Sequence, residues 1–484
     1  MKRFILGLVG LVVLAFAQQS IEGTWEGGIK IHGIELGMEV EFVTGGDELT
    51  ATIDIPQQGA KDLELINVTF EGSKVHFELE PEPGTLAIFD GELAEGEITG
   101  DFTQGPSTGT FYLKPLLEVE LPYIEEEVKI ESTEDVTLAG TLTIPEGEGP
   151  FPATILITGS GKQDRDENIF GFKIFAIIAD HLTRNGIAVL RCDDRGFLES
   201  TGEGGLGENT SKDYAEDVKA QVDYLKTRTE VDTTKIGLLG HSEGGIIAGM
   251  VAADNPDVEF VVLMAGTALP GDEVLKAQMV ALLEAEGLSE EEIAEQRALQ
   301  DQLLEYALTG EGEDELRKDL KKVTKAYIKR ETTKKERKAL GNLNDYVEKR
   351  LEGQLEVVRS SWYRFFLTYD PREDLKNVDS RVLAFFGAKD VQVVAEQNAP
   401  ALEALFTEIG KENYIIKTCC TANHLFQAAE TGAVSEYAQL PKEFVPCFLP
   451  NVTNFILGFP QVPCPDCKDG GCEKARTGKC PHHK

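Results

Sequence analysis

A serine flanked by glycines is the residue in this sequence best suited to nucleophilic chemistry. Ser242 lies in the run Gly240-His241-Ser242-Glu243-Gly244, after an apolar stretch and before helix-compatible residues that include no proline. This pattern predicts a strand, a sharp turn and a helix, which is the context of a nucleophile elbow. Side chains at positions 240 and 244 would obstruct the strained turn, so both glycines have a steric reason to be there. The alternative interpretation is a Gly-rich turn before a buried helix, in a chain with 48 glycines.

A serine hydroxyl needs a base, and that base is nearly always a histidine. In chains with this kind of elbow, the acid and the histidine follow the serine. Of the 7 histidines, those that follow Ser242 are His424, His482 and His483. The last two lie in a C-terminal tail rich in Cys, Pro and Lys, so His424 is the candidate base.

The acid that orients the histidine should lie between Ser242 and His424, just beyond a strand. The apolar run Val382-Leu383-Ala384-Phe385-Phe386 leads through a glycine turn to Asp390, whose carboxylate could reach the imidazole. The long separation between Ser242 and Asp390 predicts an insertion.

A glycine-rich segment follows another apolar strand, Ala153 to Thr158. The residues Gly159-Ser160-Gly161 would turn backbone N–H groups toward the nucleophile, which is how an oxyanion hole is assembled. The alternative is a phosphate-binding turn, but the third glycine and the Lys-Ser/Thr pair of nucleotide loops are missing.

The elements that would position these residues form an α/β pattern. The strand at 153–158 is followed by a predicted helix from Phe172 to Asn185, a strand at 187–191, a helix at about 211–227 and the elbow strand. This order predicts a mostly parallel, doubly wound sheet. Two alternating segments, 128–132 and 136–144, precede it and predict an antiparallel entry hairpin.

The region before this hairpin has a different character. Apolar and polar residues alternate in short runs separated by turn clusters, for example at 37–43, 49–55, 74–79 and 109–113, which predicts an antiparallel sandwich or small barrel. Gly23-Thr24-Trp25 resembles the opening of lipocalin-like barrels, in which the indole plugs one end. That resemblance implies ligand binding as one role for this domain, with a structural or substrate-presenting role as the alternative. His32 and His76 are interpreted as surface or packing residues.

Five blocks in order give the region from about Glu125 to Phe459 a family resemblance. It resembles bacterial α/β-hydrolases of the thermophile-type carboxylesterase kind, which are distant relatives of prolyl oligopeptidase and serine aminopeptidases. The blocks are Gly159 to Asp166, Arg191 to Gly196, Gly240 to Gly245, Ser361 to Leu367, and the segments around Asp390 and Asn423-His424.

The resemblance implies an α/β-hydrolase fold and a role for each candidate residue. Ser242 would be the nucleophile, His424 the base and Asp390 its orienting acid. By matching position, the oxyanion donors would be the backbone N–H groups of Ser160 and Glu243.

The insertion, at about 270–370, is dense in Glu, Lys, Leu and Ala and is predicted to be a helical lid. Ser289 and Glu292 form a capping box within it. Trp362, near its end, is interpreted either as a wall of the substrate pocket or as plain packing between lid and core.

Cysteines mark two departures from the family pattern. Cys192 stands where such esterases commonly have an aromatic residue, and Cys419-Cys420 precedes His424. In an exported protein, a structural disulfide from this pair to Cys192 or Cys447 is favoured over redox control.

The first 17 residues predict export. Lys2-Arg3, an apolar run and Ala15-Phe16-Ala17 make a secretory signal peptide, so the protein is expected to be secreted or periplasmic. The apolar run is too short for a membrane span. The formal net charge of −37 disfavours nucleic-acid and membrane-surface roles, because such a field repels phosphates and anionic headgroups.

These observations predict a signal peptide at 1–17, an N-terminal β domain at 18–118, an α/β-hydrolase domain at 119–460 and a tail at 461–484. The tail has four cysteines and His482-His483, which could form disulfides or a small zinc site. Export favours disulfides.

The predicted function is a serine carboxylesterase that hydrolyses short- to medium-chain acyl esters through an acyl-enzyme. Its expected partner is a small-molecule ester, with no cofactor and no catalytic metal. The alternatives are a serine peptidase or aminopeptidase of the same fold, and a non-catalytic binding protein that acts through the N-terminal domain. The sequence does not determine the oligomeric state.

Overall fold

The computed structural model describes residues 20–463, apart from 32–33, 46–47, 56–57, 59, 81–83, 117–119, 203–206, 335–336 and 338–339. The predicted signal peptide and the Cys/His-rich segment from Cys464 onward lie outside the described residues. The chain divides into two compact units, of which the first ends at Glu118 and the second begins at Val119.

The first unit is a nine-stranded sheet in which every paired strand is antiparallel. Its spatial order is β4-β3-β2-β1-β9-β8-β7-β6-β5. The strands are β1 Gly23–Ile31, β2 Ile34–Gly45, β3 Glu48–Ile55, β4 Ala60–Glu64, β5 Ile66–Glu71, β6 Lys74–Leu79, β7 Ala87–Ala94, β8 Glu97–Gln104 and β9 Ser107–Pro115. The N–H of Leu65, between β4 and β5, donates to the carbonyl of Ala51 in β3 at 2.9 Å. The other edge strand, β5, also contacts β3, so the two edges of the sheet lie close together.

The interior of this unit is built from the alternating apolar residues. Phe77 stacks on Phe89 at 4.6 Å, and Phe111 meets both rings edge-on. Trp25 is buried, and its indole N–H donates to the carbonyl of Ile21 at 2.8 Å. His76, on β6, pairs with Asp90 at 2.7 Å, which agrees with a surface role. The prediction of an all-β first domain, either a sandwich or a small barrel, is confirmed, and the sheet observed is close to a barrel.

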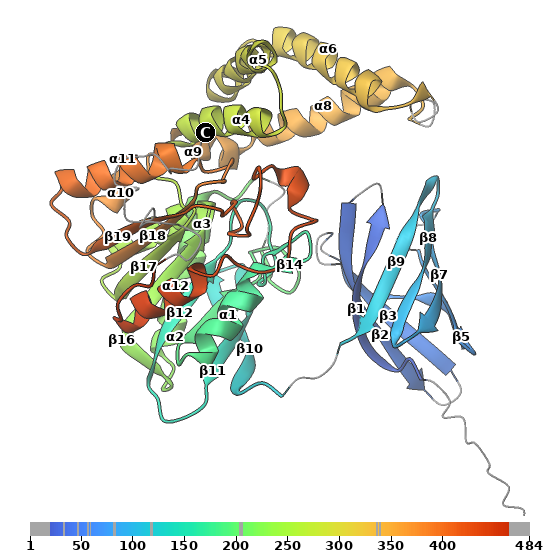
Figure 1. Cartoon of the computed structure of the whole chain (residues 1–484), viewed down its shortest axis with the longest axis horizontal. Coiled ribbons are helices and arrows are strands. Elements are labelled where there is room, and N and C mark those ends of the chain that lie inside the picture. The colour runs from blue at the N-terminus through green and yellow to red at the C-terminus, as the bar shows by residue number, and fades with distance from the viewer. Residues whose placement is uncertain are drawn as a thin grey trace, which may run out of the picture. The chain divides into compact units, whose positions relative to one another are not determined.

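The second unit is organised around an eight-stranded sheet (Figure 1). Its order is β10-β11-β15-β12-β16-β17-β18-β19, with β10, β11 and β15 joined antiparallel and all later pairs parallel. The strands are β10 Tyr123–Thr133, β11 Val136–Pro145, β12 Phe151–Ile157, β15 Ala188–Cys192, β16 Val231–His241, β17 Val258–Met264, β18 Arg381–Gly387 and β19 Tyr414–Cys419. A short hairpin, β13 Asn168–Ile169 and β14 Phe172–Lys173, follows β12.

Helices cover both faces of this sheet because its central strands are apolar on both sides. Leu239 shares a core with helices α1 Ile174–Arg184 and α12 Phe448–Leu457. Its neighbour Leu238 shares the other core with α2 Ser211–Lys226, α3 Glu243–Asp254 and α11 Ala395–Glu408. The predicted α/β-hydrolase fold class is confirmed. The helix expected from Phe172 begins two residues later, because Phe172 and Lys173 form β14.

The predicted insertion separates β17 from β18 and is helical (Figure 1). It contains α4 Gly271–Ala285, α5 Glu290–Thr309, α6 Glu313–Glu331, α8 Leu343–Arg359, α9 Ser361–Thr368 and α10 Arg372–Leu375. The expected capping box is present, with Ser289 and Glu292 bonded reciprocally at the start of α5. Buried leucines and valines give the insertion a core of its own, which includes Leu304, Val347, Leu351 and Leu355. In the described part of the chain, no helix is long and apolar enough to cross a membrane.

Candidate active site

Ser242 occupies the turn between β16 and α3. Its backbone has φ 54° and ψ −116°, a strained conformation for a residue with a side chain. A Cβ on Gly240 would lie 2.0 Å from the carbonyl oxygen of Gly244, and one on Gly244 would lie 2.2 Å from that of Ile157. The steric reason expected for both glycines is therefore confirmed. The turn is held by the N–H of Ser242, which donates to the carbonyl of Met264 at 2.9 Å.

Asp390 and His424 are brought together from two separate loops. Nδ1 of His424 lies 2.8 Å from Oδ2 of Asp390, and both side chains are buried. The other carboxylate oxygen, Oδ1, accepts from the backbone N–H groups of Gln392 and Val393. The carboxylate is therefore fixed by its own loop and presents one oxygen to the imidazole.

Local features of the sequence allow the two loops to approach. Gly387 ends β18 in the loop that carries Asp390, and a Cβ there would lie 2.4 Å from the carbonyl oxygen of Ala422. The buried amide oxygen of Asn423 accepts from the N–H groups of Leu425 and Gln427, at 3.0 and 2.9 Å. These bonds shape the loop that carries His424.

The ring of His424 also lies against the elbow. Its centroid is 4.7 Å from that of His241, the residue immediately before Ser242. The imidazole therefore lies beside the elbow while Asp390 binds its Nδ1. Ser242 itself is half-buried.

The exit of β12 adjoins the elbow, as expected for an oxyanion hole. A Cβ on Gly159 would lie 3.4 Å from Cβ of Ser242. The N–H of Gly159 donates to Glu167 Oε1 at 2.7 Å, so it is already engaged, whereas Ser160 is the next residue and is exposed. Glu243 is the first residue of α3, where N–H groups lack intrahelical acceptors and the helix dipole favours an anion.

The carboxylate of Glu243 contacts the insertion. It is 4 % exposed, and both of its oxygens accept from Nε1 of Trp362, at 2.9 and 3.0 Å. The hydroxyl of Ser211, at the start of α2, donates to the same group at 2.6 Å. Trp362 in turn stacks on Phe366, with centroids 5.7 Å apart. Trp362 therefore anchors the insertion to the elbow.

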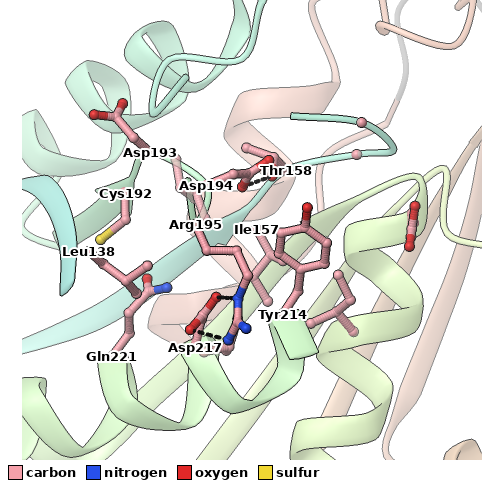
Figure 2. Close-up of a pocket in the computed structure, with 16 residues that line it drawn as sticks. Leu138, Ile157, Thr158, Cys192, Asp193, Asp194, Arg195, Tyr214, Asp217 and Gln221 are labelled. Carbon is pink, nitrogen blue, oxygen red and sulfur yellow. Dashed lines mark hydrogen bonds and ion pairs between the residues drawn. The ribbon is translucent and has the colours of Figure 1, made fainter. Parts of the chain in front are cut away.

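A cavity of about 30 Å³ lies beside the elbow, between β12, β15 and α2 (Figure 2). This volume suits water molecules rather than a substrate. Asp194 faces it, and burial raises the pKa of this carboxyl well above its usual range, while Thr158 and the N–H of Gln163 bond to it. Arg195 and Asp217, which also line the cavity, form the ion pair drawn in Figure 2. Its two hydrogen bonds are 2.6 and 2.7 Å long.

The cysteines near His424 differ from expectation. Cys192 is a buried free thiol on β15, so the disulfide considered between it and the Cys419-Cys420 pair is not formed. The sulfur atoms of Cys419 and Cys447 are 3.1 Å apart, a contact longer than the roughly 2.0 Å of a disulfide bond. Cys420 is disulfide-bonded. Among the described residues, no group of three or more His, Cys, Asp or Glu side chains is arranged to hold a metal ion.

Two buried residues of the site were not singled out in the sequence. His241 appears there only as a variable position of the elbow motif, and Glu167 only as the residue after the Gly159 to Asp166 block. Neither has a spacing signal, because their contact joins two loops that are far apart in the chain.

Comparison with known proteins agrees with this description. Residues 172–330, which include Ser242, match the family model described as Serine aminopeptidase, S33. Over 192 residues the chain is 38% identical to Esterase EstD of Thermotoga maritima. This aligned region covers 38% of this chain and 45% of that protein. It is 27% identical over 156 residues to an alpha/beta hydrolase domain-containing protein, WAV2, of Arabidopsis thaliana, covering 32% of this chain and 46% of the relative.

The chain thus spans less than half the length of these two curated relatives. Among solved structures, a Pyrococcus furiosus esterase matches with a TM-score of 0.40 and 13% identity, over 63% of this chain and 84% of that one. The structure of DcsB with a substrate analogue matches with a TM-score of 0.40 and 17% identity, over 69% and 99%. The family match and the relationship to an esterase confirm the predicted resemblance.

Proposed function

We propose that this chain, whose second unit is an α/β-hydrolase of the serine hydrolase class, is a carboxylesterase for short- to medium-chain acyl esters. The observation that carries the proposal is the buried pair of Asp390 and His424 beside a strained Ser242. A serine in such a turn, with a carboxylate-oriented imidazole next to it, is the arrangement that acyl transfer needs.

In the proposed reaction, Oγ of Ser242 attacks the ester carbonyl while Nε2 of His424 removes its proton. Asp390 keeps Nδ1–H of the imidazole bonded, which leaves Nε2 free to act as base and stabilises the imidazolium that forms. His424 then passes the proton to the leaving alkoxide. Water, activated by the same histidine, attacks the acyl-enzyme and releases the acid.

The negative charge that develops on the carbonyl oxygen needs N–H donors. We assign this role to the backbone N–H groups of Glu243 and Ser160. The position of Glu243 at the N-terminus of α3 supports the first assignment. The close approach of Gly159 to Ser242 supports the second, because it brings the β12 exit to the nucleophile.

The insertion supports an apolar pocket of limited length. Trp362 and Phe366 stack beside the elbow, held there through Glu243. Each methylene buried against such a wall adds up to about 0.8 kcal/mol until the chain meets an obstruction. Specificity constants should therefore rise over the first few acyl carbons and then fall.

The family description favours a second candidate, an aminopeptidase. That activity needs a carboxylate free to bind the substrate's amino terminus. Two buried carboxylates beside the elbow already have side-chain partners: Glu243 accepts from Trp362 and Ser211, and Asp390 binds His424. Glu167 binds His241 and Gly159 through Oε1, and its other oxygen has no partner among the described residues but is fully buried. This engagement favours the ester.

The test is a comparison of 4-nitrophenyl esters from acetyl to dodecanoyl with aminoacyl 4-nitroanilides, using the wild type and Ser242→Ala. We expect a maximum among the shorter esters, and loss of activity by several orders of magnitude in Ser242→Ala and in His424→Ala. A better rate with an aminoacyl anilide than with every ester would replace the esterase proposal by the aminopeptidase. Wild-type activity in Ser242→Ala would remove the mechanism, and no activity on either series would favour a binding protein.

We also propose that the protein is exported, on the evidence of residues 1–17 alone. Expression of the full chain in a bacterium should give a secreted or periplasmic product whose N-terminus is Gln18. Intact Met1 on a cytoplasmic product would contradict this proposal.

A further inference from the structure

His241 is buried in the elbow with an acceptor at each ring nitrogen. The residue is 1 % exposed. Its Nδ1 lies 2.8 Å from Glu167 Oε1, and its Nε2 lies 3.1 Å from the backbone carbonyl oxygen of His424. Glu167 is fully buried, and its Oε1 also accepts the N–H of Gly159 at 2.7 Å.

The hydrogens available to these contacts can be counted. A carbonyl oxygen has no proton to donate, so Nε2 of His241 must carry one. Oε1 of Glu167 accepts the N–H of Gly159, and its contact with Nδ1 of His241 holds one further proton. That proton lies either on Nδ1, which gives an imidazolium and a carboxylate, or on Oε1, which gives a neutral pair.

The surrounding charges favour the imidazolium. Burial opposes a charged ring, yet the charge and hydrogen bond of Glu167 outweigh it, and the pKa of His241 is raised above its ordinary value. The carboxylate of Asp390 acts in the same direction. The other titratable groups that interact with this pair are His424 and Asp194.

We propose that His241 is a protonated positioning residue which, with Glu167, fixes the exit of β12, the elbow and the loop that carries His424 relative to one another. Three segments meet at this pair: the exit of β12 through Gly159, the end of β16 through His241, and the loop after β19 through the carbonyl of His424. In the sheet, β19 lies three strands from β16, so the bond to His424 spans a distance that no strand pairing covers. The inference rests on the proposed roles of Ser242 and His424.

The replacement Glu167→Gln separates positioning from charge. An amide cannot stabilise the imidazolium, so His241 becomes neutral and the pair remains without net charge. One bond is then lost, either to the carbonyl of His424 or to the N–H of Gly159. Both losses displace a reacting group rather than a binding surface, so kcat should fall about 10- to 100-fold with KM changed less than about threefold.

The decisive measurement is the protonation of the ring in the full chain. Histidine labelled with ¹⁵N should show protons on both ring nitrogens of His241 at pH 8, assigned by their absence in His241→Gln. Glu167→Gln should lose one of them, and Glu167→Asp, which keeps the carboxylate, should retain both signals and recover part of kcat.

Asp166→Asn is the matched control, because it removes a carboxylate from the same loop that pairs with Arg191 at 2.9 Å and does not contact His241. It should keep both ring protons and wild-type kcat. A single ring proton on His241 in the wild type would overturn the proposal, whether or not Glu167→Gln folds. Unchanged kcat in a folded Glu167→Gln would overturn the positioning role. Neither result depends on which ester is cleaved. Failure of the esterase proposal would instead appear as wild-type activity in Ser242→Ala.

Discussion

The indole N–H of Trp362 donates to both carboxylate oxygens of Glu243, at 2.9 and 3.0 Å. Trp362 belongs to α9 of the helical insertion, and Glu243 is the residue next to Ser242. The insertion and the elbow are therefore joined by a charge-assisted hydrogen bond, which is stronger than a neutral one.

The substitution Trp362→Phe should show how much this bond contributes to stability and activity. Phenylalanine keeps an aromatic ring against Phe366 but leaves the buried carboxylate with Ser211 as its side-chain donor. The expected cost is about 1–3 kcal/mol in unfolding free energy, because a buried acceptor loses its partner. A shift of Glu243 should also lower kcat/KM about tenfold, since the same residue carries a proposed oxyanion donor.

The matched control is Tyr363→Phe, which removes a hydroxyl from the same helix. Urea denaturation and ester kinetics on both variants test the expectation. Equal behaviour of the two variants would mean that the indole N–H has no special role.

The substitution Asp390→Asn should distinguish the role of Asp390 in orienting His424 from its role in stabilising the fold. The amide oxygen can still accept from the N–H groups of Gln392 and Val393, so the loop should remain folded. The amide nitrogen would face Nδ1 and force the wrong imidazole tautomer, so kcat should fall by about 10³-fold or more. An unchanged melting temperature together with this loss supports the role, whereas near-normal kcat would assign Asp390 to structure alone.

Asp164 should make stability depend on pH. Burial, followed by the charge of Asp166, raises the pKa of this carboxyl from 3.8 to about 6. The folded state thus holds the proton more tightly than the unfolded state, so this stabilisation is present at low pH and is lost as pH rises through about 6. At pH 8, a pKa difference of about two corresponds to a loss of about 3 kcal/mol in unfolding free energy relative to low pH.

The test variant is Asp164→Asn, which keeps the Oδ1 acceptor used by the N–H groups of Asp166 and Asn168. It should be more stable than the wild type at pH 8, and this difference should shrink at pH 4. Urea unfolding at both values checks the sign, and an equal difference at both would refute it.

Glycine substitutions in α3 should test the packing of the elbow. Gly244→Ala would bring a Cβ within 2.2 Å of a backbone oxygen, and we expect a loss of about 3 kcal/mol or more in unfolding free energy. Gly249→Ala, in the same helix, would place its Cβ 3.3 Å from a leucine side-chain atom and should stay within about 1 kcal/mol of the wild type. Circular dichroism in urea compares the two, and similar losses would show that helix packing in general, rather than the elbow, is sensitive.

Much of the site could be predicted because its parts follow strands. Ser242 follows β16 and Asp390 follows β18, so the apolar runs and glycines in the sequence mark where each loop begins. The parallel sheet then brings the strand ends to one edge. His424 could be found by its order in the chain.

Contacts between loops could not be predicted in the same way. The side chain of Glu167, from a later turn, accepts the N–H of Gly159 and so decides which N–H after β12 is already bonded. The bond between Trp362 and Glu243 joins residues 119 positions apart, and neither has a local pattern that requires a partner. The considered pairing of Cys192 was wrong because its strand, β15, is not adjacent to β19 in the sheet.

The part of the insertion from α4 to α9 begins and ends at nearly one point. A Cβ on Gly271, the first residue of α4, would lie 2.3 Å from the carbonyl oxygen of Phe366 in α9, so the two ends of this segment touch. The strands that it separates, β17 and β18, are paired neighbours whose register is set within the sheet. Closing such a gap with a short linker costs little chain entropy. The segment from α4 to α9 can therefore be replaced while the crossover to β18 stays in place, so that access to the proposed pocket could be altered while the strands keep their alignment.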